Sequence, residues 1–428
     1  MVTLEMVLLT ENMKKALKQV IINKGAPGVD GMTVEELTPW IKAHPHELTE
    51  QIRKGRYRQH PVLRKYIPKD NGEQRPLGIP RVIDRLVQQA VAQVLSDEYE
   101  PKFSDNSYGF RPGRRAQDAV DKVIANANDG YEYVIDLDLA KFFDTVNHSK
   151  LLQVLSETIK DGRVISLIHK FLRAKIQDGK EISIPTMGTP QGGPISPVLA
   201  NILLNELDQE LERRGHRFVR YADDMVIMCK SIRATQRAYE TIGKFITDKL
   251  FLKINEDKTK VGYLGSGINF LGFTFYERTD ADGTKKWRSA VSKKSWKRLK
   301  KKVKALTDRR CPKGIAKMKE EVSTILRGWA NYFRWGLAQS KAMEFDGWLG
   351  RRIRQMYWKQ WKRIRTRYDK LRSYGLDHRR AYEWANASKS YWRIAGSWIL
   401  ATVLKNKVLE DEGWKRLNFF MDKELLIC

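Results

Sequence analysis

The stretch Phe218-Val-Arg-Tyr-Ala-Asp-Asp-Met-Val-Ile-Met228 places two adjacent carboxylates between two apolar runs. This pattern is typical of a tight turn that joins two β-strands. Neighbouring carboxylates repel each other and resist the loss of water beside buried strands, so a divalent cation with a preference for oxygen ligands would neutralise Asp223 and Asp224. The alternative is a solvated hairpin turn, because Asp is common in turns.

A metal site needs a further ligand, and Asp138 is the candidate. It lies at the end of a predicted strand, Val134 to Leu139, which would run beside the hairpin in a split β-α-β arrangement. Three carboxylates on neighbouring strand ends can hold two Mg²⁺ ions, which activate an attacking hydroxyl and stabilise the leaving oxygen in phosphoryl transfer. We expect Asp136 on the opposite face of the strand and Asp144 beyond the next turn, so both receive structural roles.

Three further side chains have chemistry that suits a nucleotide. Phe143 follows Asp138 by five residues, so the chain leaving the strand would bring its ring over a bound sugar. The segment Tyr66 to Ile79 has two apolar runs around an Asp-Asn-Gly sequence, which predicts a β-hairpin. Lys69 and Arg75 lie near its tip, where cations can neutralise phosphate.

Composition indicates a folded protein of two to four domains, with 428 residues, 42% apolar and 30% charged. No apolar run approaches the length of a membrane span, and the start lacks a basic region and a cleavage site, so we expect a cytosolic protein without a membrane partner. The three cysteines are odd in number and far apart. Their spacing excludes a disulfide framework and a zinc knuckle or ribbon.

The net charge of +28 is concentrated in one part of the chain. Residues 1–280 hold 41 Lys and Arg against 37 Asp and Glu, whereas residues 281–370 hold 28 against 7. Eleven of the twelve Trp residues lie at or beyond Trp287. A basic, aromatic-rich segment of this kind suggests a nucleic-acid surface. The alternative is a solvated basic face over a Trp-rich core, and we assign most of the Trp residues to core.

The order of elements predicts the fold class. From 131 to 276 the chain reads strand, helices, strand, turn, strand, helix, strand, which is a ferredoxin-like split arrangement with an antiparallel sheet covered by helices. Its last part is expected to be a short strand pair covering Tyr263 to Tyr276. Gly188 to Pro197 is predicted to be a loop that opens a helix from Val198 to Arg214. From about residue 290 only helical periodicity remains, so the fold class is α+β.

Seven sequence blocks occur in a fixed order between residues 60 and 276. They are RKYIPKDNGEQRPLGIPRVIDRLVQQAV, SYGFRPGRRAQDAV, VIDLDLAKFFDTVNH, GTPQGGPISPVLANILLNELD, RYADDMVIM, NEDKTK and FLGFTF. They resemble the blocks of group II intron reverse transcriptases, and the chain is most similar to the short bacterial group IIC intron-encoded proteins. YADD alone is weak evidence, but the ordered set is specific. The resemblance implies a right-hand polymerase of fingers, ferredoxin-like palm and all-α thumb, which copies RNA into DNA with two Mg²⁺ ions and deoxynucleoside triphosphates (dNTPs).

The resemblance also implies roles for the acidic residues and the aromatic ring. Asp138 and Asp223 match the main metal ligands of the family, and Asp224 matches the second carboxylate of the pair. Phe143 matches the bulky residue that excludes a ribose 2′-hydroxyl.

Four polar matches complete the implied site. Lys69 and Arg75 match the fingers cations that grip the incoming triphosphate, where Arg can bind in a bidentate manner. Gln191 matches the loop that lies against the nascent base pair. Lys258 matches a palm lysine that protonates pyrophosphate, although an ordinary surface lysine is the alternative for this residue.

The implied domains are residues 1–85, an amino-terminal extension with the first part of the fingers; 86–285, the palm with the remaining fingers elements; 286–365, the thumb or domain X, which carries the maturase function; and 366–428, a short helical DNA-binding region. The stretch RGWANYFRW at 327–335 is the most recognisable part of the thumb. Longer relatives carry an endonuclease with paired cysteine motifs, and this chain has neither the length nor the cysteines, so no endonuclease domain is expected.

The resulting hypothesis is an RNA-directed DNA polymerase that also acts as a maturase. It would bind its group II intron RNA to assist splicing, and copy the intron into DNA at a target DNA during retrohoming, using an RNA template with a DNA primer. This would take place in a ribonucleoprotein in the bacterial cytoplasm. Two alternatives are a protein that serves mainly as an RNA-binding splicing factor, and a related reverse transcriptase recruited to another task such as DNA repair. The three intact carboxylates favour an active polymerase.

Overall fold

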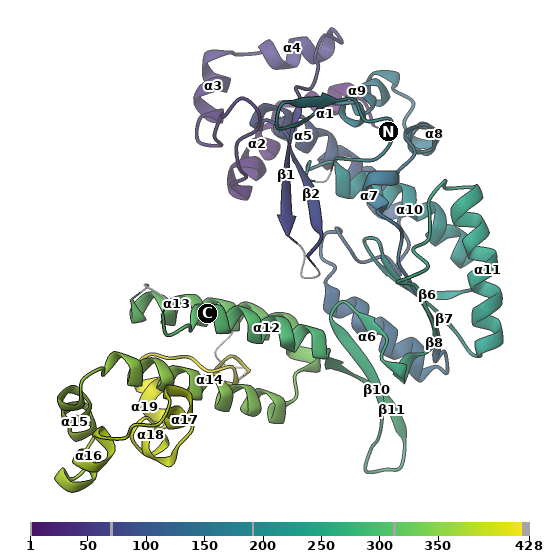
Figure 1. Ribbon diagram of the computed structural model, residues 1–428. Coiled ribbons are helices and arrows are strands. Elements are labelled where there is room, and N and C mark those ends of the chain that lie inside the picture. The colour runs from purple at the N-terminus through teal and green to yellow at the C-terminus, as the bar shows by residue number, and fades with distance from the viewer. Residues whose placement is uncertain (1, 69–71, 191, 311–313, 422–428) are drawn as a thin grey trace. The chain divides into compact units, whose positions relative to one another are not determined.

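The computed structural model describes residues 2–68, 72–190, 192–310 and 314–421. The chain divides into two compact units, Met1–Leu271 and Gly272–Cys428. The first combines helices with sheets, whereas the described part of the second is mostly helical (Figure 1). The fold is therefore mixed α+β, as the sequence predicts. Two of the predicted site residues, Lys69 and Gln191, lie outside the described ranges.

The first unit contains a four-stranded antiparallel sheet with the strand order β6-β7-β3-β8. Its strands are β3 (Tyr133–Leu137), β6 (Arg217–Tyr221), β7 (Asp224–Cys229) and β8 (Lys260–Tyr263). In chain order this is the second, third, first and fourth strand, which is the ferredoxin-like arrangement predicted from the sequence. The helix α6 (Ala116–Asn128) contacts β6 and β7, and α11 (Ile232–Asp248) contacts β3, β7 and β8.

The register between β3 and β7 brings distant acidic residues together. Both strands are largely apolar and buried, and they pair from Tyr133 with Cys229 to Leu137 with Met225. Because the strands are antiparallel, one further step along this register places Asp138 level with Asp224. The sequence interval of more than eighty residues is thus closed by strand pairing.

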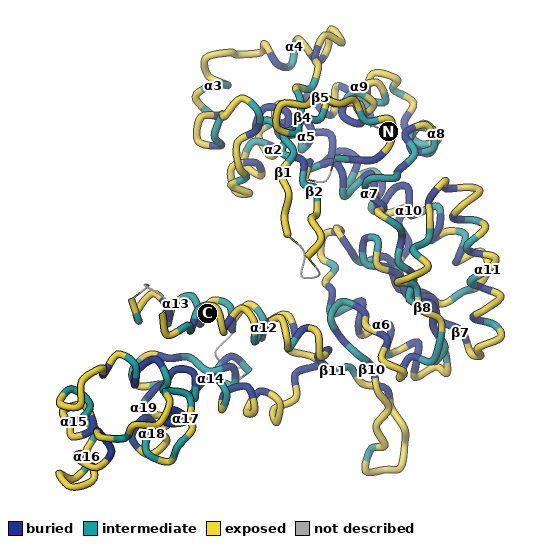
Figure 2. Tube along the Cα trace, viewed as in Figure 1, coloured by how far each residue is buried: buried dark blue, intermediate teal, exposed yellow. Residues whose placement is uncertain are grey.

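A second sheet in the same unit has the order β2-β1-β4-β5. Its strands are β1 (Val62–Pro68), β2 (Gln74–Ile79), β4 (Ile176–Asp178) and β5 (Glu181–Ser183). The antiparallel pairing of β1 with β2 confirms the predicted hairpin. Much of this hairpin is exposed, whereas strands β3 and β7 of the first sheet are largely buried (Figure 2).

One hydrophobic cluster joins the helices of the first unit to its β6-β7-β3-β8 sheet, and α5 (Val82–Tyr99) is buried along most of its length. Helix α10 starts at Ser196 with Pro197 in its first turn, and it ends at Arg213 shortly before Gly215, which has φ +72°. The remaining elements of this unit are α1 (Leu4–Leu8), α2 (Thr10–Asn23), α3 (Leu37–Ala43), α4 (Glu47–Arg53), η1 (Glu100–Lys102), α7 (Phe142–Thr145), α8 (His148–Thr158), α9 (Gly162–Leu172), α10 (Ser196–Arg213), η2 (Leu264–Ser266) and β9 (Asn269–Phe270).

The second unit begins with a hairpin of β10 (Phe273–Thr279) and β11 (Lys285–Val291). The predicted strand pair within Tyr263 to Tyr276 is confirmed, because β9 and β10 are neighbours in a sheet with the order β11-β10-β9, and the prediction missed the third strand, β11. β11 escaped prediction because exposed Lys and Arg side chains interrupt its apolar pattern. The helices that follow are α12 (Lys293–Leu306), α13 (Ile315–Phe333), η3 (Arg334–Gly336), α14 (Gln339–Gln360), α15 (Ile364–Ser373), α16 (His378–Ala385), α17 (Tyr391–Ala395), α18 (Trp398–Val403), α19 (Asn406–Asp411) and η4 (Asn418–Phe420).

The last described turn is held by a buried carboxylate. Asp346 of α14 accepts hydrogen bonds from the backbone N–H groups of Leu417, at 2.7 Å, and Asn418, at 3.0 Å. Trp414 is fully buried beside this segment. Among the described residues, none of the helices is both long enough and apolar enough to cross a membrane.

Candidate active site

The two adjacent carboxylates lie at a strained two-residue turn. β6 and β7 pair as far as Tyr221 with Asp224, so Ala222 and Asp223 form the turn itself. Ala222 has φ +58°, a left-handed conformation that costs a residue with a Cβ roughly 1–2 kcal/mol. The rest of the fold must therefore hold this turn in place.

A buried arginine supplies that support. Arg220 is inaccessible to solvent, and its Nη1 donates to the carbonyl oxygen of Ala222 at 3.0 Å and to Oδ1 of Asn201 at 2.9 Å. Its Nε and Nη2 donate to the two carboxylate oxygens of Asp208, at 2.8 and 2.5 Å. Asp208 is also fully buried, so the pair has the bidentate geometry and the additional hydrogen bonds that a buried ion pair requires.

Close packing supports the turn from a third side. A Cβ atom built on Gly109 would lie 2.2 Å from the backbone nitrogen of Ala222, so only glycine allows this approach. Asn201 donates from Nδ2 to the carbonyl oxygen of Gly109 at 2.8 Å, and the N–H of Tyr108 donates to the carbonyl oxygen of Arg220 at 2.8 Å. The same side chains thus fix both the turn and the segment that packs on it.

The third predicted carboxylate, Asp138, directly follows β3. Its N–H donates to Oγ1 of Thr259 at 3.2 Å, and its carbonyl oxygen accepts from the N–H of Asn255 at 2.8 Å. Nζ of Lys258 lies 3.8 Å from Oδ1 of Asp138. Lys258 is exposed, as expected for a surface lysine, but it also faces the predicted site.

The electrostatics show that the three carboxylates interact. Loss of water is the largest cause of a raised pKa at Asp223, the charge of Asp138 adds to it, and the charge of Arg75 opposes it. At Asp224 the surrounding protein displaces water although the residue keeps an exposed surface. With the charges of Asp223 and Asp138, this raises the pKa of Asp224 to about 6, and Lys258 opposes the rise.

Asp136 is a fourth carboxylate of this group, and its predicted position on the opposite face is wrong. Residues two apart in a strand share a face, so Asp136 lies on the same face as Asp138. Loss of water raises the pKa of Asp136 to about 6, the charges of Asp224 and Asp138 add to the rise, and Lys260, its partner across the sheet, opposes it. Asp136 is therefore electrostatically part of the site.

The donor set suits a hard divalent cation. Carboxylate oxygens are the ligands that Mg²⁺ prefers, and the mutual repulsion of Asp138, Asp223 and Asp224 would be relieved by a cation between them. Within the ranges that the structure describes, however, no three His, Cys, Asp or Glu side chains converge into a group that could hold a metal ion. The residues present fit the chemistry of the ion, and their side chains would have to draw together to ligate it.

A separate pocket of about 360 Å³ contains Phe143 and Asp144. Its other walls come from β1, β2, β4 and the loop that precedes α10, and Arg64 and Lys141 contribute cations. Neither cation was predicted from the sequence. Arg64 lies in β1, away from the hairpin tip where cations were expected, and Lys141 directly precedes α7, where a lysine has no specific meaning. Asp144, assigned a structural role, also lines this pocket.

Phe143 is fixed by the loop it faces. The N–H of Thr189 donates to the carbonyl oxygen of Phe143 at 2.6 Å, and Nε2 of His148 lies 2.7 Å from the carbonyl oxygen of Gly188. On the other side, a Cβ on Gly192, which has φ +119°, would lie 2.3 Å from the carbonyl oxygen of Gly78 in β2. The loop is therefore packed between α7 and the hairpin.

The support of the turn can be tested through protein stability. Replacing Arg220 with Met leaves the carboxylate of Asp208 buried without a cation, so we expect Arg220→Met to lower the free energy of unfolding by about 3–5 kcal/mol. Urea unfolding of the purified protein measures this change. The control, Arg213→Met, breaks only the exposed pair with Glu210 and should leave the transition nearly unchanged.

The double variant Arg220→Met/Asp208→Leu separates charge from packing. Since it removes both members of the pair, it should regain most of the stability lost by Arg220→Met. A double variant that is no more stable than the single one would show that the unpaired charge is not the cause of the loss.

Comparison with known proteins identifies the two segments. Residues 67–275 match the reverse transcriptase (RNA-dependent DNA polymerase) family, and residues 296–375 match the group II intron, maturase-specific domain. Protein YkfC of Escherichia coli K12 is 34% identical over 302 residues, which is 61% of this chain and 79% of YkfC. The group II intron-encoded protein LtrA of Lactococcus lactis is 30% identical over 345 residues, 65% of this chain, and the match spans 57% of LtrA.

Among solved structures, a chain of a partial Cas6-RT-Cas1–Cas2 complex aligns with 57% of this chain and 42% of its own length, at 23% identity and a TM-score of 0.36, a likeness too low to carry an argument. The sequence matches are decisive. With a reverse transcriptase segment followed by a maturase-specific segment, the chain belongs to the group II intron reverse transcriptase and maturase family.

Proposed function

We propose that this protein copies RNA into DNA at Asp138, Asp223 and Asp224, and that it acts as a maturase of the bacterial group IIC type. In this role it would bind its intron RNA to assist splicing and copy the intron into DNA at a target DNA site. The observation that carries the polymerase proposal is the β3–β7 register, which puts Asp138 level with the Asp223–Asp224 turn. We further propose that it acts in a ribonucleoprotein in the bacterial cytoplasm; two of its relatives are bacterial proteins.

In the proposed site Asp138 and Asp223 are the main ligands of two Mg²⁺ ions, and Asp224 assists them. Bound there, the ions would supply activation of the primer 3′-hydroxyl and stabilisation of the leaving pyrophosphate. Lys258, whose ammonium lies beside Asp138, would give a proton to the pyrophosphate. The buried Arg220 would hold Ala222, and with it the turn that carries Asp223, in the left-handed conformation during this chemistry.

The nucleotide would be selected by the pocket around Phe143. Phe143 would lie against the sugar and exclude a 2′-hydroxyl, while Arg75 would bind the triphosphate, supported by its electrostatic influence on Asp223. Lys69 and Gln191 complete this proposal from the sequence resemblance, since both lie outside the described residues.

The catalytic proposal predicts a large effect of two conservative substitutions. Asp138→Asn and Asp223→Asn each remove a negative charge with little change in shape. Loss of about 4 kcal/mol of transition-state stabilisation corresponds to a roughly thousand-fold lower rate. The measurement is single-turnover extension of a DNA primer on an RNA template, together with the Mg²⁺ concentration that gives half the maximal rate.

Asp129→Asn is the matched control, because Asp129 is an exposed aspartate after α6. It should extend the primer at the wild-type rate. Equal rates for Asp223→Asn and wild type would refute the catalytic assignment. Retained splicing of intron RNA by Asp223→Asn would show that maturase and polymerase activities are separable.

The Phe143 proposal predicts a change in sugar selection. Truncation in Phe143→Ala would open space for a 2′-hydroxyl, so the preference for dNTPs over ribonucleotides should fall about 10- to 100-fold, as expected when a steric clash is removed. Competing dNTP and ribonucleotide incorporation measures the preference. Phe143→Tyr keeps the ring and should retain it. Unchanged selection in Phe143→Ala would rule out the steric role.

The second unit provides the proposed RNA surface, consistent with its maturase-specific match. We propose it as the thumb and DNA-binding region, with the first unit as fingers and palm. Helix α12 buries Leu299 and Val303 on one side. The exposed cations of this helix are Lys293, Lys294, Lys297, Arg298, Lys301, Lys302 and Lys304.

This surface predicts a strong dependence of RNA affinity on salt. Lys297 and Lys301 lie one turn apart, so both can contact phosphates and displace counterions. Lys297→Gln/Lys301→Gln should reduce the slope of log affinity against log salt by about 1.4–1.8, at 0.7–0.9 per contact. Fluorescence anisotropy with labelled RNA at several salt concentrations measures this slope. Lys14→Gln/Lys18→Gln, with the same spacing on exposed positions of α2, is the control. An affinity of wild type that is independent of salt would contradict the proposal.

A further inference from the structure

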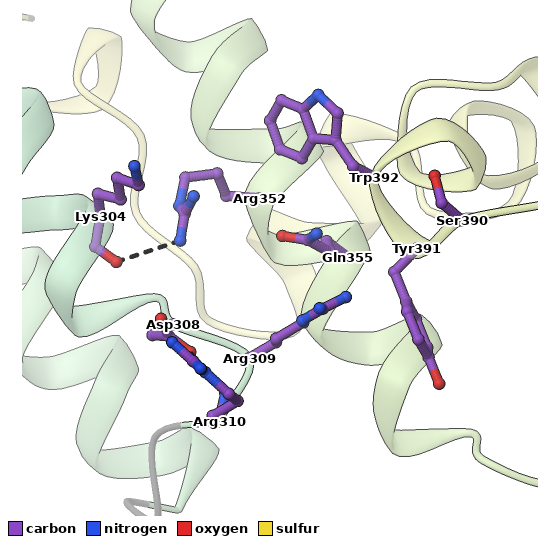
Figure 3. Close-up of a pocket in the computed structure, with 9 residues that line it drawn as sticks. All are labelled: Lys304, Asp308, Arg309, Arg310, Arg352, Gln355, Ser390, Tyr391 and Trp392. Carbon is purple, nitrogen blue, oxygen red and sulfur yellow. Dashed lines mark hydrogen bonds and ion pairs between the residues drawn. The ribbon is translucent and has the colours of Figure 1, made fainter.

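A basic cavity of about 720 Å³ lies within the second unit, formed by the end of α12 and the turn after it, α14, and the start of α17 (Figure 3). In Figure 3, Lys304 and Arg352 stand on one side, Tyr391 and Trp392 on the other, and Gln355 lies between them. The volume is in the range of small-molecule sites. It suits one nucleotide better than a helix of RNA.

Arg352 builds the cavity and is not available to a ligand in the same way as its neighbours. Its side chain is buried, with Nε donating to Oγ1 of Thr307 at 2.6 Å and Nη2 donating to the carbonyl oxygens of Thr307 at 2.8 Å and Lys304 at 3.1 Å. It thereby ties α14 to the end of α12. The position of the cavity wall is set by these bonds.

Two other cations at the cavity are free for an anion. Lys304 and Arg309 are exposed, and neither forms an ion pair with any residue that the structure describes. Arg309 lies 5.0 Å from the centre of the Tyr391 ring. By contrast, Arg310 is engaged with Asp308 at 3.3 Å. The cavity therefore presents two unneutralised positive charges beside an aromatic ring.

The opposite wall offers stacking and hydrogen bonding. Arg351 lies 4.1 Å from the Trp392 ring centre and donates to the Trp392 carbonyl oxygen at 2.9 Å, which fixes this half-buried tryptophan. The side-chain amide of Gln355 makes no hydrogen bond within the described ranges. Its N–H groups and its carbonyl oxygen are both open to a ligand in the cavity.

We propose that this cavity binds one unpaired nucleotide of RNA. This proposal rests on the proposed maturase function. Its base stacks on the Tyr391–Trp392 wall, the amide of Gln355 bonds to the base edge, and Lys304 and Arg309 hold the phosphate. Proteins recognise RNA mainly at unpaired bases that stack on aromatic side chains and expose their edges. Lys304, Arg309 and Gln355 belong to the maturase-matched segment, residues 296–375, whereas Tyr391 and Trp392 follow it. The site therefore combines residues of the maturase-matched segment with residues that come after it in the chain.

The test compares unpaired with paired RNA on the full-length protein. The probes are a fluorescein-labelled twelve-residue oligouridine and a fully paired RNA duplex, each titrated at one salt concentration with anisotropy as readout. Trp392→Ala and Gln355→Ala should each weaken oligouridine binding, by about tenfold for the tryptophan, and change duplex binding less than twofold. Two different variants are used so that a folding defect in one, seen by thermal unfolding, leaves the other decisive.

The controls lie beside the cavity. Trp398→Ala removes an exposed tryptophan of α18, and Arg393→Gln removes an exposed cation of α17; neither lines the cavity, and both should bind oligouridine as wild type does. Arg309→Gln should weaken it. Equal losses for oligouridine and duplex, or no loss in folded Trp392→Ala and Gln355→Ala, would overturn the pocket.

Two outcomes separate this inference from the proposed function. If wild type binds neither RNA, the RNA-binding function itself fails. If wild type binds both and the cavity variants behave like wild type, only the nucleotide pocket fails. An oligodeoxythymidine that shows the same tenfold loss and binds more tightly than the RNA would assign the cavity to DNA and overturn the choice of RNA.

Discussion

The buried ion pair between Arg220 and Asp208 is the interaction on which the site depends. Removing two charges from water is expensive, and such a pair is often no more stable than an apolar replacement. Here the guanidinium also binds the carbonyl oxygen of Ala222, which no apolar side chain could do. The pair therefore contributes a defined turn rather than stability alone. Gly109 packs closely against the backbone of Ala222, the residue whose position Arg220 fixes.

Strand pairing imposes the second constraint, because it forces like charges together. Asp138 follows β3, and Asp223 and Asp224 lie where β6 turns into β7. Loss of water, together with the charges of Asp223 and Asp138, raises the pKa of Asp224 to about 6. A fold gains no stability from this arrangement. Strongly perturbed carboxylates that gather at one strand edge are typical of functional sites, and here they coincide with the segment matched to reverse transcriptases.

Local patterns predicted the elements of this site better than its supports. The hairpin at Asp223 and the approach of Asp138 followed from alternation and element order, both confirmed by the pairing of β3, β6 and β7. The prediction that Asp136 lies on the opposite face of the strand from Asp138 was wrong, although the two-residue alternation of a strand puts both on the same face. The ion pair of Arg220 and Asp208 was not predicted, because an ion pair between a helix and a strand has no characteristic spacing in the sequence. The acidic residue Asp208 on the apolar face of α10 was the one sequence signal that could have indicated a buried partner. β11 was missed because its charges mask alternation.

In the proposed function the two units would neutralise phosphate in different ways, and the charge distribution agrees with this difference. Residues 1–280 are nearly balanced, with 41 basic against 37 acidic residues, although they contain the proposed polymerase site. A site that relies on divalent metal ions needs carboxylates to hold them, and these carboxylates add negative charge to this part of the chain. Residues 281–370 carry 28 Lys and Arg against 7 Asp and Glu, and in the proposed function these cations would neutralise the phosphates of RNA. The positive charge after residue 280 and the carboxylates at the ends of β3, β6 and β7 are thus two different means of neutralising phosphate.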